Sequence, residues 1–131
     1  MISTKGRYAL RVMIDIAEQN KDEYIPLKDI AERQKISKKY LEAIVKNLVD
    51  GGLLTGISGK NGGYKLTKKP NKCSIGEILT LTEGSLSTVS CLDENSVPCN
   101  RKKTCKTLPM WVELDNMVKK FFSKKHLSDL L

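Results

Sequence analysis

Hydrophobic residues recur at intervals of three and four along most of the chain, with charged and polar residues between them. This spacing places apolar side chains on one face of an α-helix. It predicts helices over residues 3–19, 25–33, 37–50, 74–83 and 107–124. Serines at positions 3, 37 and 74 precede three of these stretches, and a serine hydroxyl can accept a hydrogen bond from a free N–H of the first turn. The chain is therefore predicted to be mainly helical.

The helical period breaks between residues 51 and 66. A short apolar run, Leu53–Ile57, is followed by the glycine-rich turn Gly59–Gly63 and by a second short run, Tyr64–Leu66. Two such runs joined by a glycine turn predict a β-hairpin. A short helix over 25–33, a tight turn and a longer helix over 37–50 come just before it. Together they predict a winged helix-turn-helix, in which helix 37–50 is the recognition helix and the hairpin is the wing.

The helix over 107–124 carries two apolar stripes rather than one. They consist of Met110, Leu114, Met117 and Phe121, and of Leu108, Trp111, Val118 and Phe122. One stripe is enough to pack a helix on its own domain, so the second predicts another apolar partner, most simply a second copy of the chain. We expect dimer contacts from Trp111, Leu114, Val118, Phe121 and Phe122.

The fold class predicted is thus mainly α with a small β-hairpin: a winged helix-turn-helix followed by a long C-terminal dimerisation helix. We assign residues 1–84 to the DNA-binding part and 85–106 to a cysteine-bearing loop. Residues 107–131 form the dimerisation helix and a short terminal helix. At 131 residues the chain is expected to form one compact domain overall.

The chain has a formal net charge of +8, which favours a polyanionic partner such as nucleic acid. Lysines cluster on the predicted recognition helix and wing, so double-stranded DNA is the expected partner. The sequence contains neither a signal peptide pattern nor an apolar run near the ~20 residues that span a bilayer, which predicts a cytoplasmic protein without a membrane partner. The motifs H-E-x-x-H and G-x-S-x-G are absent and there is one histidine, so we predict no enzyme activity.

Three of the four cysteines, Cys91, Cys99 and Cys105, lie in the loop, separated by seven and five residues. Cysteines of a cytosolic protein are expected to stay reduced, which favours metal binding or redox chemistry over a disulfide framework. Thiolates select iron–sulfur clusters, zinc or copper(I). A thiol–disulfide switch without metal and three free thiols in a mobile loop are the alternatives.

Over nearly its whole length the chain resembles the IscR/NsrR/CymR group of bacterial regulators, the Rrf-two family. The resemblance is carried by the residues Ser3–Leu10 (STKGRYAL), Leu27–Ile44, Gly52–Leu66, Ile75–Ile78, the three-cysteine loop and the terminal HLSDLL. It implies a homodimeric winged-helix repressor or activator. In many members three cysteines bind an iron–sulfur cluster that changes DNA affinity, which implies Cys91, Cys99 and Cys105 as ligands, with [2Fe–2S] favoured over [4Fe–4S].

The sequence departs from the family pattern at the fourth ligand. The IscR-type pattern has a histidine three residues after the third cysteine, where this chain has Leu108. The NsrR-type pattern uses an N-terminal aspartate of the other subunit, and the matching place here is near Tyr8. The seven-residue gap between Cys91 and Cys99 is similar to that of the iron-responsive RirA type.

The positions that read DNA in IscR-like members also differ. They correspond to Lys39, Glu42, Ala43 and Ser58, and only Glu42 is retained. Glu42 can accept a hydrogen bond from a cytosine amino group in the major groove, and Lys60 can enter the minor groove. The full set of residues expected at the DNA is Lys38, Lys39, Tyr40, Glu42, Lys46, Ser58 and Lys60.

The sequence therefore predicts a dimeric regulator that reads a pseudo-palindromic operator and senses iron, redox state or nitric oxide through a cluster. The alternative is a regulator that responds to thiol oxidation or cysteine metabolism without a cluster. A non-sensing architectural DNA binder is a further alternative, and it would show salt dependence without sequence preference.

Overall fold

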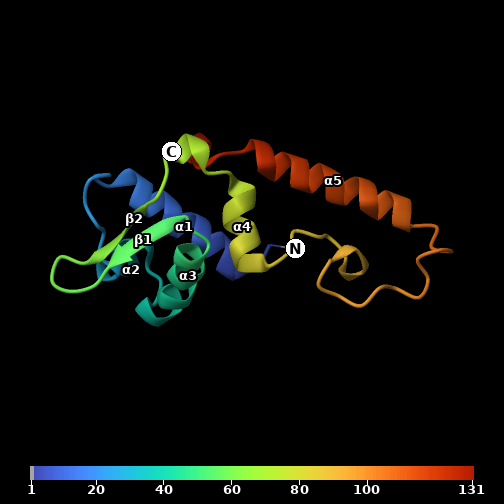
Figure 1. The fold of residues 1–131 in the computed structure, drawn as a ribbon, viewed down its shortest axis with the longest axis horizontal. Coiled ribbons are helices and arrows are strands. Elements are labelled where there is room, and N and C mark those ends of the chain that lie inside the picture. Colours follow the sequence, from blue (N-terminus) through green and yellow to red (C-terminus); the bar gives the residue numbers. More distant parts are fainter. Residues whose placement is uncertain (1) are drawn as a thin grey trace.

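A computed structural model of the protein describes residues 2–131. Within this range the helices are α1 (Thr4–Glu18), α2 (Leu27–Gln34), α3 (Lys38–Asp50), α4 (Ile75–Glu83) and α5 (Leu108–Lys124). The strands are β1 (Leu54–Ile57) and β2 (Gly63–Leu66), and short 3₁₀ turns cover Pro70–Lys72, Ser90–Leu92 and Leu127–Leu130. Figure 1 shows their arrangement. The predicted fold class is confirmed, since the five longer predicted helices and both strands are present within one or two residues of their expected bounds. The predicted short terminal helix is instead the 3₁₀ turn Leu127–Leu130.

The three serine caps form as the sequence predicts. The hydroxyls of Ser3 and Ser37 accept from the backbone amides of Gly6 and Tyr40. At α4 the capping is reciprocal, because Ser74 accepts from the amide of Glu77 while the Glu77 carboxylate accepts from the amide of Ser74 at 2.8 Å. These bonds satisfy backbone donors that a helix start would otherwise leave free.

The wing is an antiparallel hairpin whose register pairs Leu54 with Leu66 and Ile57 with Gly63. A single bridge extends it: Ile25 and Tyr64 exchange backbone hydrogen bonds of 2.8 and 2.9 Å. Glycine is needed at position 63, because its φ is +154° and a Cβ there would lie 2.3 Å from the Ile25 carbonyl oxygen. The close approach fastens the wing to the segment that leads into α2.

One hydrophobic core joins α1, α3, α4 and the base of the wing. Its fully buried side chains include Val12, Met13, Ile30, Leu41, Ile44, Leu48, Leu54, Ile78 and Leu79. The last turn of the chain adds Leu127, which is also fully buried, while Leu130 and Leu131 stay exposed. The terminal segment is therefore part of the winged body and not a loose tail.

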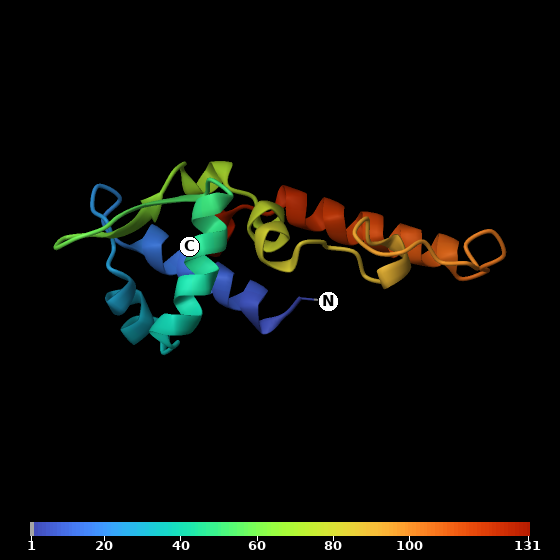
Figure 2. The same ribbon diagram turned by 60° about the horizontal axis from the view of Figure 1, so that its bottom comes forward.

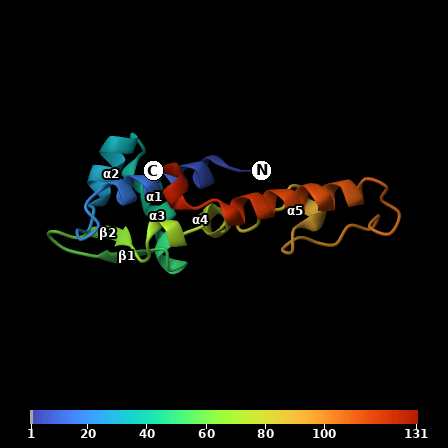
Figure 3. The same ribbon diagram turned by 90° about the horizontal axis from the view of Figure 1, so that it is seen from above.

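Helix α5 extends away from the winged body, and the loop after α4 runs along it (Figures 1, 2 and 3). The C-terminal end of α5 is anchored by two backbone hydrogen bonds of 2.8 Å. The amide of Ile75 donates to the Lys125 carbonyl, and the amide of Leu127 donates to the Cys73 carbonyl. Its N-terminal end lies at the far end of the molecule with the cysteine loop. Among the described residues no helix is both long and apolar enough to cross a membrane.

Candidate DNA-binding surface and cysteine loop

The turn between α2 and α3 is tightly built. Lys35 takes the left-handed conformation with φ +55°, and the amide of Ile36 donates to the Ala31 carbonyl at 3.2 Å. The Ile36 side chain is buried in the corner between the two helices, as its place in the sequence predicts. This turn sets the angle at which α3 leaves α2, and so orients the recognition helix.

Helix α3 has one buried face and one polar face. Leu41, Ile44 and Leu48 are fully buried against α1 and α4. The residues expected at the DNA lie on the opposite, exposed face: Lys38, Lys39, Tyr40, Glu42 and Lys46. A polar helix face that is fixed by a buried one is a suitable shape for a DNA major groove.

The wing brings further predicted residues to the same side. A groove of about 430 Å³ between α3 and the hairpin is lined by Glu42, Lys46, Ser58 and Tyr64, among others. Lys60 lies in the exposed turn between β1 and β2. The structure therefore brings Glu42 and Lys46 together with Ser58, and places Lys60 at the wing tip beyond them.

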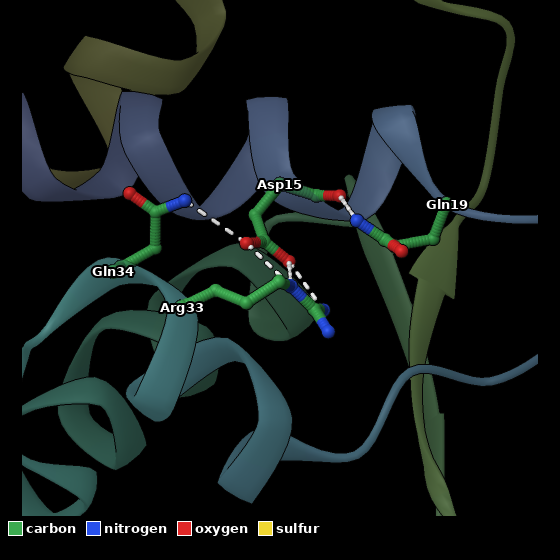
Figure 4. A network of polar contacts seen from close by, with 4 residues as sticks. All are labelled: Asp15, Gln19, Arg33 and Gln34. Atoms are coloured by element: carbon green, nitrogen blue, oxygen red, sulfur yellow. Dashed lines mark hydrogen bonds and ion pairs between the residues drawn. The ribbon is translucent and has the colours of Figure 1, made fainter.

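A buried carboxylate holds α1 to α2. Asp15 is 3 % exposed and accepts from the Arg33 guanidinium at 2.7 Å and from the Gln34 side-chain amide at 2.9 Å. Its backbone carbonyl accepts from Gln19, and Figure 4 shows the four residues. The hydrogen bond to Asp15 raises the pKa of Arg33 above its ordinary value. The sequence reasoning missed this network, although a carboxylate directly beside the apolar stripe of α1 was a signal for it.

A second set of contacts reaches α3 from α1. The Arg11 side chain donates to the Gln34 side-chain oxygen at 3.1 Å and also to the Gln34 carbonyl. The same guanidinium lies 5.0 Å from the centre of the Tyr8 ring, and the Tyr8 ring meets the Tyr40 ring edge to face. Tyr8 therefore packs against Tyr40 of the recognition helix.

The three loop cysteines are free thiols. Cys91 and Cys105 are partly buried, and Cys99 is exposed. Within residues 2–131 no three histidine, cysteine or acidic side chains lie close enough to hold a metal ion.

The cysteines have different chemical surroundings. A 3.2 Å contact with the Thr107 hydroxyl, just before α5, lowers the pKa of the Cys105 thiol, with smaller help from backbone amides and from Arg101. Burial raises the pKa of Cys73, which belongs to the winged core. The Thr107 contact thus favours the thiolate form of Cys105, whereas Cys73 is a small apolar core residue.

The start of the loop is tied to α5 by a buried aspartate. The amide and hydroxyl of Thr88 donate to the Asp115 carboxylate at 2.6 and 2.7 Å, and Lys119 lies 3.8 Å from it. Burial alone would raise the pKa of Asp115. The hydrogen bonds from Thr88, with Lys119 and Ser87, outweigh burial and hold the pKa below its ordinary value. Sequence reasoning did not find this tie, because a lone aspartate in a charged helix gives no sign of burial.

The two apolar stripes of α5 differ in what covers them. In the monomer Leu114 is 39 % and Phe121 is 56 % exposed, in line with Met110 and Met117. The other stripe, with Trp111, Val118 and Phe122, is partly buried. Val118 and Phe122 face Ile2 and residues 85–88 of the same chain across a small cavity of about 170 Å³.

A helix-turn-helix with a polar recognition helix beside a β-hairpin defines a winged-helix transcription regulator. The sequence profile of the Rrf2 family, described as an iron-dependent transcriptional regulator, matches residues 2–131. The chain belongs to the Rrf2 family, which confirms the resemblance noted from the sequence.

Comparison with individual proteins agrees with this family assignment. The chain is 32 % identical over 130 residues to the HTH-type transcriptional regulator IscR of Yersinia pseudotuberculosis, which covers 99 % of this chain and 78 % of that protein. It is 35 % identical to the solved structure of CymR (YrzC), the global cysteine regulator of B. subtilis, with a TM-score of 0.78 over 99 % of this chain and 95 % of that one. The oxidized form of Staphylococcus aureus CymR matches at 32 % identity and a TM-score of 0.74, covering 99 % and 94 %. These relatives are regulators and not enzymes, as the sequence predicts.

Proposed function

We propose that the protein binds DNA sequence-specifically through α3 and the wing and regulates transcription in the cytoplasm. The observation that carries the proposal is the polar, exposed face of α3 beside Lys60 of the wing. Helix α3 enters the major groove, where Glu42 accepts from a cytosine amino group. Lys38, Lys39 and Lys46 contact phosphates or guanine, and Lys60 reaches the neighbouring minor groove.

The exposed stripe of α5 supports a homodimer as the active form. Met110, Leu114, Met117 and Phe121 follow one another on a helix that extends beyond the winged body. A contiguous apolar stripe of this kind is a common mark of a protein–protein contact, and a two-fold dimer pairs the same stripe from each copy. Two winged domains then read a pseudo-palindrome with half-sites about one helical turn, or a multiple of it, apart.

The cysteine loop is the sensing element of this proposal. Cys91, Cys99 and Cys105 supply thiolates, which prefer iron–sulfur clusters among the common cofactors, with [2Fe–2S] favoured over [4Fe–4S]. Similarity to IscR over the whole chain supports this assignment. When bound, such a cluster would supply a redox-active, oxygen- and nitric-oxide-sensitive group to a loop that is tied to α5 at Thr88.

A second candidate is direct thiol oxidation without a cluster. It is favoured by the lowered pKa of Cys105, which the Thr107 hydroxyl contacts. Similarity to the oxidized form of S. aureus CymR also supports it. In this case oxidation of a loop thiol changes the loop, and the loop changes the position of α5 and the spacing of the two recognition helices.

Anaerobic purification separates the two candidates. The protein and a Cys91→Ala variant are compared by absorption spectrum, iron content and acid-labile sulfide, with Cys73→Ala as the matched control. Iron and sulfide in the wild type and in Cys73→Ala, but not in Cys91→Ala, are the result expected for a cluster. A colourless wild type after reconstitution contradicts the cluster, and leaves thiol oxidation to be tested by DNA binding before and after peroxide treatment.

A further inference from the structure

Tyr40 lies in the first turn of the recognition helix, but it is not held by the hydrophobic core. Its side chain is 36 % exposed, and it directly follows the exposed Lys39 in the sequence. The Tyr8 ring of α1 contacts it edge to face, with ring centres 5.7 Å apart and an angle of 80° between the planes. An aromatic pair with this geometry favours one orientation of each ring.

Tyr8 is itself in contact with a second side chain. The Arg11 guanidinium, one helical turn further along α1, lies 5.0 Å from the Tyr8 ring centre. Arg11 is fixed by its bonds to the side chain and the carbonyl of Gln34, the last residue of α2. The Arg11 side chain thus connects the helix-turn-helix corner to the aromatic pair.

The far end of this set of contacts is rigid. The Gln34 side-chain amide donates to Asp15 at 2.9 Å, and Asp15 is buried and bound by Arg33 (Figure 4). A glutamine whose nitrogen is held in this way presents its oxygen in one direction only, which is toward Arg11. The contacts therefore run from the buried Asp15 carboxylate to the exposed Tyr40 ring on the recognition helix.

We propose that Tyr8 and Arg11 are positioning residues for DNA binding, because they fix the orientation of the Tyr40 side chain. The Tyr40 hydroxyl then contacts a DNA phosphate without a change of rotamer. This inference rests on the proposed DNA binding and deepens it, because neither Tyr8 nor Arg11 needs to touch the DNA. The benefit is preorganisation: a side chain that is already oriented loses less conformational entropy on binding.

The test is a double-mutant cycle on operator affinity with an operator selected from a random DNA library. The variants are Tyr8→Leu, Tyr40→Ala and the double variant, with Tyr8→Phe as the conservative control because it keeps the ring. Tyr8→Leu is expected to weaken binding about fivefold, within the range that one aromatic pair supports. Tyr8→Phe is expected to bind like the wild type.

The decisive quantity is the coupling free energy between positions 8 and 40 for operator binding. If Tyr8 acts through Tyr40, Tyr8→Leu has no further effect in the Tyr40→Ala background. Equal losses of affinity in both backgrounds, or an equal loss of affinity in Tyr8→Phe, overturn the positioning role.

Phosphate ethylation interference gives a second measurement that a general loss of stability would not change. One phosphate per half-site should lose its interference in both Tyr40→Ala and Tyr8→Leu. A thermal melt of each variant shows that the fold is kept.

Arg11→Lys tests the other end of the contacts, since lysine keeps the charge but cannot hold both oxygens of Gln34 in the same way. It is expected to weaken binding in the wild type and to have no effect in Tyr40→Ala. A wild-type protein that selects no DNA sequence at all contradicts the proposed function, whereas a selective wild type with unchanged Tyr8→Leu and Arg11→Lys affinities contradicts only this inference.

Discussion

The winged body and the α5 arm differ in how they are stabilised. Nearly all buried hydrophobic side chains belong to the body, which includes Leu127 from the end of the chain. Helix α5 has Asp115 as its one buried residue, and it carries five of the ten large hydrophobic side chains that stay exposed among the described residues. The body thus completes its core within one chain, whereas the arm has an apolar face that a partner can cover.

The largest effect is expected where the end of the arm enters the body. Leu127→Ala leaves a cavity in a fully buried site and should lower the free energy of unfolding by about 2–5 kcal/mol. Leu130→Ala, at a site that is 46 % exposed, is the matched control and should change it by less than about 0.5 kcal/mol. Urea unfolding of both variants measures the difference. A loss of unfolding free energy in Leu127→Ala that is as small as the loss in Leu130→Ala would show that Leu127 does not belong to the core.

The exposed stripe of α5 should matter for association and not for the fold of the monomer. Met117 is 62 % exposed, so Met117→Glu should weaken the dimer about thirtyfold or more while the melting temperature of the monomer stays unchanged. Asn116→Glu adds the same charge to the neighbouring position, which is also exposed but lies off the stripe, and should leave the dimer intact. Sedimentation at several concentrations reports the effect. A Met117→Glu protein that remains dimeric contradicts the assignment of this stripe.

The tie between the loop and α5 should depend on the charge of Asp115. Asp115→Asn removes an ionised acceptor for the two Thr88 donors, and should cost about 1–3 kcal/mol of local stability. Hydrogen exchange at the Thr88 amide, relative to Ile78 in the core, measures it. Thr88 should lose protection in the variant while Ile78 keeps it.

The pH dependence of this tie has a definite sign. The pKa of Asp115 is lowered in the folded protein, so the stabilisation is fully present above the ordinary aspartate pKa of about 3.9 and is lost as the pH falls through the lower folded value. Thr88 protection, corrected for intrinsic exchange, should therefore be the same at pH 7 and pH 5. Loss of protection between these values would show that the carboxylate is not held as described.

The smallest effect is expected at the wing tip. Lys60→Ala should weaken DNA binding modestly for every sequence and reduce the slope of log affinity against log salt concentration by about one, as the loss of one phosphate contact does. Lys21→Ala, an exposed lysine in the loop after α1, is the control and should leave the slope unchanged. Titrations at several salt concentrations give the slopes.

Sequence reasoning succeeded where local rules decide the structure. Periodic apolar positions placed five helices, three of them with caps at Ser3, Ser37 and Ser74, and the glycine turn placed the wing. Ser74 and Glu77 have the spacing of a capping box, and both of its bonds are present. These features depend on residues within a few positions of each other, so the order of residues alone carries the information.

The polar contacts that the sequence did not predict join residues that are distant in the sequence. Asp15 with Arg33 and Thr88 with Asp115 are polar pairs separated by eighteen and twenty-seven positions. Their burial depends on how helices cross, which periodicity does not report. The spacing of Cys91, Cys99 and Cys105 likewise predicts soft-metal chemistry. It does not report whether the loop brings the three thiols together when no metal is bound.

Selection of bound sequences from a random double-stranded DNA library tests the central claim most directly, with Glu42→Ala run in parallel. The account predicts enrichment of a pseudo-palindrome with two half-sites about one helical turn, or a multiple of it, apart. The Glu42→Ala variant should enrich the same symmetric site with a relaxed preference at one base pair in each half. Binding that depends on salt but enriches no sequence would contradict the account, and so would a selected site that is unchanged by the loss of Glu42.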